Sequence, residues 1–208
     1  MLNLSSPSRP NRLRRGLRLE YFTLVWNAIE AIVGMVAGIV SGSVSLVAFA
    51  LDSVVEASSG AVLMSRLKAE QKGKHADDLE RRAIRQLAWA FFALAAYVGF
   101  RAVQALVTQS RPEDSPVGIG LAIVSLTIMP VLARKKRKVA AELDSRALQA
   151  DSTQTDLCTY LSAILLVGLL ANSLLGWWWA DPIAGLGIAF IAAKEGRELW
   201  VEEGICCK

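Results

Sequence analysis

The stretch that decides the fold is SGSVSLVAFALDSVVEASSG, residues 41–60. It is apolar enough to lie in a membrane, yet it contains Asp52 and Glu56, four positions apart. On a helix this spacing places both carboxylates on one face, about 6 Å from each other. A carboxylate at bilayer depth costs roughly 2.5–3.5 kcal/mol on insertion scales and usually marks an ion or proton path. We therefore expect the other segments to enclose this pair.

The composition indicates a polytopic membrane protein. Of the 208 residues, 53% are hydrophobic and 20% are charged, and the charges collect in short blocks between long apolar segments. The three cysteines do not form a disulfide framework, because one lies in an apolar run and two are adjacent near residue 207. The first apolar run is about 20 residues long without a small-residue cleavage site, which favours an uncleaved spanning helix over a signal peptide.

Six apolar runs are each long enough to cross a hydrocarbon core of about 30 Å. They cover about 21–41, 44–65, 86–108, 116–134, 147–175 and 181–200. We expect an all-α membrane protein with six transmembrane helices. Its predicted parts are a basic cytoplasmic N-terminal segment (1–20), a six-helix transmembrane domain (21–200) and a short cytoplasmic tail (201–208).

The basic residues predict the orientation. With the N-terminus in the cytoplasm, 21 of the 23 lysines and arginines lie in cytoplasmic segments, and only Arg101 and Arg111 do not. This bias predicts an integral protein of the plasma (inner) membrane with both termini in the cytoplasm. Topology explains the basic run RKKRK at 134–138, with binding to anionic lipid as the alternative. The net charge of +4 then gives no reason to expect nucleic acid as a partner.

Several ionisable residues lie at span depth: Glu30, Asp52, Glu56, Arg101, Asp151, Asp156 and Asp181. Asp181 begins a helix and is expected to cap it at the interface. Asp151 lies near the cytoplasmic mouth of the fifth span, where solvent can reach it. At 1.5 Å per residue, the acidic pair of the second span comes level with residues 154–158 of the fifth, near the midplane, and Glu30 reaches a similar depth.

Acids clustered in a low dielectric need something positive beside them. Shared protons, Arg101 or a bound cation could supply it. A divalent cation neutralises two carboxylates, and its departure invites protons onto them, which is a physical basis for metal/proton exchange. In the alternative, the acids only hold helices together. Polar contacts in membranes contribute about 0.6 kcal/mol on average, little beside the insertion cost, so we favour transport.

The second span resembles the second helix of the cation diffusion facilitators, which export zinc and related divalent metals. Four other pieces are similar: Asn27 in the first span, KGKHADDLE after the second, ALQAD opening the fifth and WADP before the sixth. The resemblance covers about 21–200. It implies a six-helix bundle in which an acidic pair on the second helix binds metal together with an H-x-x-x-D or D-x-x-x-D pair on the fifth.

The chain departs from that pattern in two places, the acidic pair and the fifth helix. Glu56 stands where the family has Asp, which keeps the charge and lengthens the reach. Aligning ALQAD places Gln154 and Cys158 at the fifth-helix ligand positions, with Asp156 between them, about 200° around the helix from Gln154. Either Gln154 and Cys158 bind directly, or a local bulge turns Asp156 inward. These departures are similar to a compact, divergent branch of the family that lacks the usual C-terminal cytoplasmic domain.

The resemblance and its departures imply a mixed ligand set. The candidate metal ligands are Asp52, Glu56, Gln154, Asp156 and Cys158. A sulfur among carboxylates favours zinc, with Cd²⁺, Co²⁺, Ni²⁺ and Fe²⁺ left open. The metal is expected as a substrate, with no cofactor. The other expected partners are protons and the lipid bilayer, and a homodimer is left open.

Four residues also have interpretations that do not involve metal binding, or only a limited role in it. Cys158 could instead be a small buried hydrophobe. Cys206 and Cys207 could collect soft metal at the inner mouth, although adjacent cysteines cannot enclose an ion alone. His75 is expected to be a solvated loop residue.

Other functional classes have little support. No G-x-x-x-x-G-K-[ST], H-E-x-x-H or G-x-S-x-G motif occurs, so an ATP-driven module, a zinc protease or a serine hydrolase is not indicated. We predict that the chain is not an enzyme. One alternative is an intramembrane aspartyl hydrolase in which Asp52 and Asp156 share a proton, but the G-x-G-D signature of that class is absent. Another is a non-transporting membrane partner protein with structural acids.

Overall fold

The computed structural model describes residues 9–71 and 77–205, which form six α-helices and no strand. The helices are α1 (Arg9–Ser41), α2 (Val44–Gln71), α3 (Asp77–Val107), α4 (Pro116–Leu143), α5 (Arg146–Leu175) and α6 (Ala180–Ile205). The prediction of an all-α membrane bundle with six helices is confirmed, and five of the six predicted spans meet the length and composition of a membrane span.

Five of these helices are long and apolar enough to cross a membrane: Asn11–Ser41, Val44–Ser65, Ala88–Val107, Pro116–Leu143 and Asp151–Leu175. The sixth, α6, has 26 residues but carries Lys194, Glu195 and Arg197 in its second half. Large apolar side chains, among them Ile32 and Phe190, are exposed on the outer surface, whereas several carboxylates are buried inside. The interior also contains a large apolar core, but an apolar outer surface together with buried carboxylates is the distribution of an integral membrane protein.

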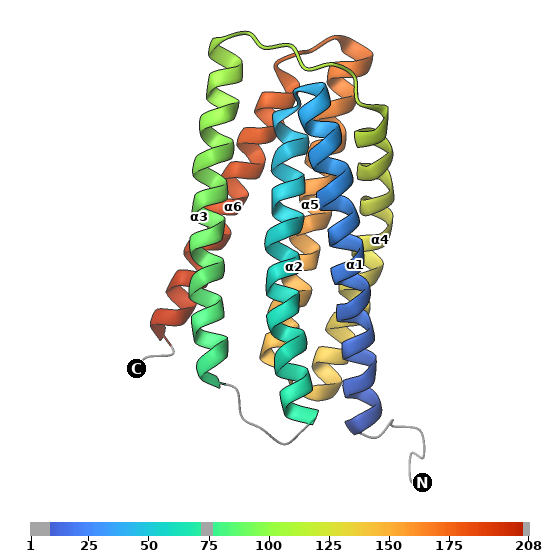
Figure 1. The fold of residues 1–208 in the computed structure, drawn as a ribbon, viewed down its shortest axis with the longest axis vertical. Coiled ribbons are helices and arrows are strands. Elements are labelled where there is room, and N and C mark those ends of the chain that lie inside the picture. The colour runs from blue at the N-terminus through green and yellow to red at the C-terminus, as the bar shows by residue number, and fades with distance from the viewer. Residues whose placement is uncertain (1–8, 72–76, 206–208) are drawn as a thin grey trace.

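The six helices are arranged as a four-helix bundle with a helix pair beside it. Helices α1, α2, α4 and α5 run side by side, while α3 and α6 pack against each other along one flank (Figure 1). Helix α2 contacts α1, α3, α5 and α6, so it is the most enclosed of the five apolar helices. Helix α1 begins and α6 ends at the same end of the molecule (Figure 1). An acid on the inner faces of α2 therefore lies at the centre of the structure.

Short connections fix how neighbouring helices sit against each other. Between α1 and α2 only Gly42 and Ser43 intervene; Gly42 adopts φ +69°, and Ser43 N–H donates to Gly38 O at 3.0 Å. Between α4 and α5, Ser145 is the N-cap of α5 and its side chain accepts from Leu148 N–H at 3.4 Å. These tight turns leave little freedom for α2 to slide against α1, or α5 against α4.

The helices end close to the predicted outer limits, and all except α5 continue past the predicted inner ones. Helix α1 begins at Arg9 rather than near residue 21, and α4 continues to Leu143 rather than to about 134. The added turns of α1 and α4 pack into a second apolar cluster, formed by Leu13, Leu63, Leu67, Val139, Ala140, Leu143 and Leu148. A helix continues wherever one face still has a packing partner, and a count of apolar residues detects only the membrane part.

Candidate functional site

Asp52 and Glu56 lie on the buried face of α2. Their side chains are only 5% and 1% exposed, as the four-residue spacing predicts for an inward-facing pair. The two carboxylates are close enough to interact electrostatically. Two carboxylates one turn apart inside a bundle require protons or a positive partner, because an uncompensated buried charge is strongly destabilising.

One oxygen of Glu56 is engaged and the other is not. Thr155 Oγ1 of α5 donates to Glu56 Oε1 at 2.9 Å, whereas Glu56 Oε2 is buried without a hydrogen-bond partner in residues 9–71 and 77–205. The buried Cys158 lies beside the same carboxylate, one turn further along α5. An unpaired buried carboxylate oxygen is costly, so the position in front of Oε2 favours a cation.

Gln154 faces α2 through Ser59. The Ser59 hydroxyl is 2.7 Å from Gln154 Oε1 and 2.9 Å from the backbone oxygen of Glu56, but it has only one proton to donate. If Ser59 donates to the Glu56 carbonyl, the Gln154 amide, rotated by 180°, can donate from Nε2 to the Ser59 oxygen. Rotation also resolves the unpaired Nε2, which has no partner within the described part of the chain. It leaves the Gln154 carbonyl oxygen free to face a cation.

Glu30 of α1 adds a third carboxylate near the pair. Trp26 Nε1 donates to Glu30 Oε1 at 2.7 Å, while Ser53 Oγ lies 3.3 Å from Glu30 Oε2 and 3.2 Å from the backbone oxygen of Phe49, and its single proton can go to either. Glu30 interacts electrostatically with both Asp52 and Glu56. The hydrogen bond from Trp26 holds the Glu30 carboxylate in place, where it adds negative charge beside the pair.

Asp156 is turned to a different neighbour. Its carboxylate pairs with Arg137 of α4, and the two side chains are 32% and 47% exposed. Helix α5 is an uninterrupted α-helix across this region, so the bulge that would turn Asp156 inward does not occur. The structure thus brings Glu56 together with Cys158, places Gln154 one turn away and pairs Asp156 elsewhere.

A buried lysine below the acidic pair is the feature that sequence reasoning missed. Lys136 of α4 is wholly buried; its Nζ lies 2.5 Å from Asp151 Oδ2 and 3.4 Å from Glu20. Two expectations are corrected here. The run RKKRK is not only a topology signal, since one of its lysines is internal, and Asp151 is 6% exposed rather than solvated.

A periodic signal in the first span could have revealed this interior. Four polar residues on α1 are 0% exposed and recur at helical spacing: Glu20, Thr23, Asn27 and Glu30. Such a stripe in an apolar segment indicates a face turned toward other polar groups rather than toward lipid. It would have predicted an inward carboxylate at Glu20.

Asp181 and Arg101 have roles other than those expected. Asp181 does not cap its own helix at the interface; it is buried and accepts from Ser43 Oγ at 2.5 Å, from Val44 N–H at 2.8 Å and from Ser45 Oγ. It therefore caps the start of α2 from α6. Arg101 is exposed on α3 and donates to Gln104 at 2.9 Å, so it does not neutralise the buried acids.

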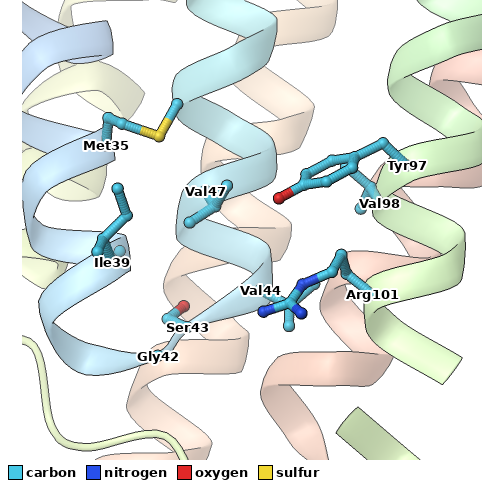
Figure 2. Close-up of a pocket in the computed structure, with 10 residues that line it drawn as sticks. Met35, Ile39, Gly42, Ser43, Val44, Val47, Tyr97, Val98 and Arg101 are labelled. Carbon is cyan, nitrogen blue, oxygen red and sulfur yellow. The ribbon is translucent and has the colours of Figure 1, made fainter. Parts of the chain in front are cut away.

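The concavity drawn in Figure 2 lies between the turn that joins α1 to α2 and the outer part of α3. Its lining includes Met35, Ser43, Val47, Tyr97 and Arg101, and no acidic residue. It is therefore separate from the acidic pair.

Within the described part of the chain, no three His, Cys, Asp or Glu side chains converge closely enough to hold a metal ion. Asp52, Glu56 and Cys158 are neighbours rather than a closed ligand set. His75, Cys206 and Cys207 lie outside the described residues.

The comparison with protein families decides the identity. A family profile described as the cation efflux transmembrane domain matches residues 84–204, more than half of the chain. The chain belongs to the cation efflux family. This membership confirms the predicted family through residues outside the second span, and it supports a transporter rather than an enzyme.

Relatives of this cation efflux protein are similar over most of its length. The uncharacterized transporter sll1263 of Synechocystis sp. is 29% identical over 193 residues, which are 88% of this chain and 62% of that protein. The cation-efflux pump FieF of Salmonella typhi is 27% identical over 154 residues, 71% of this chain and 51% of the pump. The magnetosome protein MamB of Magnetospira sp. is 26% identical over 175 residues, 80% and 59% of the two chains. The chain spans about half to three fifths of the length of these relatives.

Proposed function

We propose that this chain transports divalent metal cations, zinc first among them, out of the cytoplasm in exchange for protons. The observation that carries the proposal is the fully buried pair of Asp52 and Glu56 on the most enclosed helix, with Glu56 Oε2 unpaired among the described residues. Membership of the cation efflux family supports a metal ion as the substrate.

The cation is bound between α2 and α5. Asp52 and Glu56 supply the two negative charges that a divalent ion neutralises, while the carbonyl oxygen of Gln154 and the sulfur of Cys158 supply neutral or soft donors. The sulfur favours zinc over Mg²⁺, which prefers oxygen ligands. Asp156 stays a candidate ligand only for a state in which its pair with Arg137 is broken.

Protons replace the cation on the same side chains. Once the metal leaves, two adjacent carboxylates in a low dielectric repel each other, and proton uptake removes that repulsion. Metal release and proton binding are then coupled at one place. In the predicted orientation both termini lie in the cytoplasm and the protein is in the plasma membrane. Metal transport in exchange for external protons is then export from the cell.

Flux measurements on reconstituted protein test this proposal. In proteoliposomes with an internal zinc indicator and an imposed pH gradient, Asp52→Asn and Glu56→Gln are expected to lower zinc flux by at least about tenfold. Asp114→Asn and Glu113→Gln are the matched controls, because they make the same changes at exposed acids between α3 and α4 and should leave flux unchanged. Wild-type flux in both buried-site variants would refute the proposal, and zinc binding without flux would favour a non-transporting membrane protein.

The aspartyl hydrolase alternative requires Asp52 and Asp156 to share one proton. The Asp156 carboxylate instead pairs with Arg137, and the family match is to transporters. No observation favours hydrolysis.

A further inference from the structure

We propose that Lys136 is a positioning residue for the cation site and acts through Thr155 on Glu56. The inference rests on the proposed function, because it takes Glu56 as a ligand of the transported ion. It assigns a task to the buried ammonium that neither topology nor the ligand pattern accounts for.

Three hydrogen-bond acceptors fix the ammonium group. Lys136 Nζ lies 2.5 Å from Asp151 Oδ2, 3.4 Å from Glu20 Oε2 and 3.3 Å from Thr155 Oγ1. An ammonium has three N–H donors and no acceptor, so these three contacts use its full capacity. Because Lys136 is 0% exposed and its partners come from α1 and α5, the group has no water to turn toward.

The ammonium sets the direction of the Thr155 hydroxyl. Lys136 donates into Thr155 Oγ1, so the single proton of Thr155 must point to another acceptor. Two acceptors are near: Glu56 Oε1 at 2.9 Å and the backbone oxygen of Asp151 at 3.2 Å. The carboxylate is nearer and charged, and charge-assisted hydrogen bonds are the stronger ones. The bonds therefore run in one direction, from Lys136 to Thr155 to Glu56.

The result is a carboxylate with one oxygen satisfied and one available. Thr155 donates to Glu56 Oε1, while Glu56 Oε2 has no partner among the described residues. Cys158 lies beside the same carboxylate. Glu56 is thus presented as a ligand through a single oxygen. Outer-shell hydrogen bonds of this kind orient metal ligands and are worth about 10–100-fold in metal affinity.

A positioning role and a simple charge effect have opposite signs. Lys136 carries a positive charge near the cation site, so through-space repulsion alone predicts that its removal tightens cation binding. Positioning through Thr155 predicts that its removal weakens binding. The direction of the change therefore separates the two.

The test measures Zn²⁺ binding by calorimetry and zinc flux in proteoliposomes, with the full chain and Zn²⁺ alone as probe. Lys136→Met and Thr155→Val should each raise the zinc dissociation constant and the KM of transport by about 10–100-fold, with the maximal rate largely kept. Thr155→Ser retains the hydroxyl and should keep wild-type values. The double variant should bind zinc as tightly as whichever single variant binds it less tightly, because both substitutions break the same hydrogen-bond connection. Lys138→Met removes an exposed lysine from the same turn of α4 and is the control.

Tighter or unchanged binding in Lys136→Met, or additive losses in the double variant, would overturn the inference. If Lys136→Met does not fold, the comparison of Thr155→Val with Thr155→Ser decides, since both leave the contacts of Lys136 with Asp151 and Glu20 in place. Equal zinc affinity in those two would overturn the inference while the proposed function stands. A wild-type protein that neither binds nor moves zinc would overturn both.

Discussion

Glu56 and Cys158 lie beside each other where α2 and α5 meet, and the Cys158 sulfur is a soft donor next to the acidic pair. A thiolate favours zinc and cadmium over hard ions, so this side chain distinguishes a selective transporter from a general one. The other interpretation of Cys158, a small residue that fills space, makes a different prediction for its substitutions.

Cys158→Ser is expected to weaken Cd²⁺ binding by more than about tenfold while weakening Zn²⁺ binding less, because an oxygen replaces a soft sulfur of similar size. Competition binding with the two metals measures the ratio. Cys158→Ala is the control for packing, and it should lose cadmium affinity in the same way. Unchanged cadmium affinity in both variants would show that Cys158 only fills space.

At the residue scale, the burial of the acidic pair could be predicted from the sequence, but the residues that surround it could not. The four-residue spacing of Asp52 and Glu56 predicts a shared buried face, and that face is observed. Lys136 could not be recognised because its four basic neighbours match the composition of an ordinary cytoplasmic loop. Its burial depends on α4 continuing past the predicted end of the span near residue 134 to a packing partner, which is a tertiary effect.

At the scale of elements, close approach between α5 and α6 depends on a missing side chain. A Cβ added at Gly168 would lie 2.7 Å from Ala184 Cβ, an atom fixed to its backbone. At Gly120 on α4 an added Cβ meets nothing within 4 Å. We therefore expect substitution by alanine to have opposite effects on stability at these two glycines.

Gly168→Ala is expected to destabilise the protein by about 1–3 kcal/mol, because α5 and α6 must move apart to accommodate the methyl group. Gly120→Ala should be neutral or stabilise by up to about 1 kcal/mol, because alanine is the better helix former. Unfolding in mixed micelles, followed by helical circular dichroism, gives both values. Equal stability of the two variants would contradict the packing described for these helices.

The element boundaries show what periodicity and composition can and cannot predict. The starts of α2, α4 and α5 agree with expectation within a residue or so because Gly42, Pro116 and Ser145 mark them chemically. The inner ends of α1, α3 and α4 were placed too early or too late, because no residue type marks the point where a helix leaves the membrane.

At the scale of the whole molecule, a set of buried polar groups runs through an interior that is otherwise apolar, and large apolar groups cover the outside. The buried polar side chains run from Lys136, Glu20 and Asp151 through Thr155 to Glu56 and Glu30. The fold class and the six helices could be predicted from the sequence, because apolar length is a local property. The continuity of these buried groups could not, because it depends on which faces of α1, α2, α4 and α5 meet.

The most direct test of the account is to locate zinc by anomalous diffraction at its absorption edge, in crystals of the full chain grown with Zn²⁺. We predict a peak between α2 and α5, with a Glu56 oxygen at about 2.0–2.2 Å and the Cys158 sulfur at about 2.3 Å. A zinc ion bound elsewhere, with the carboxylates of Asp52 and Glu56 free of metal, would contradict the central claim.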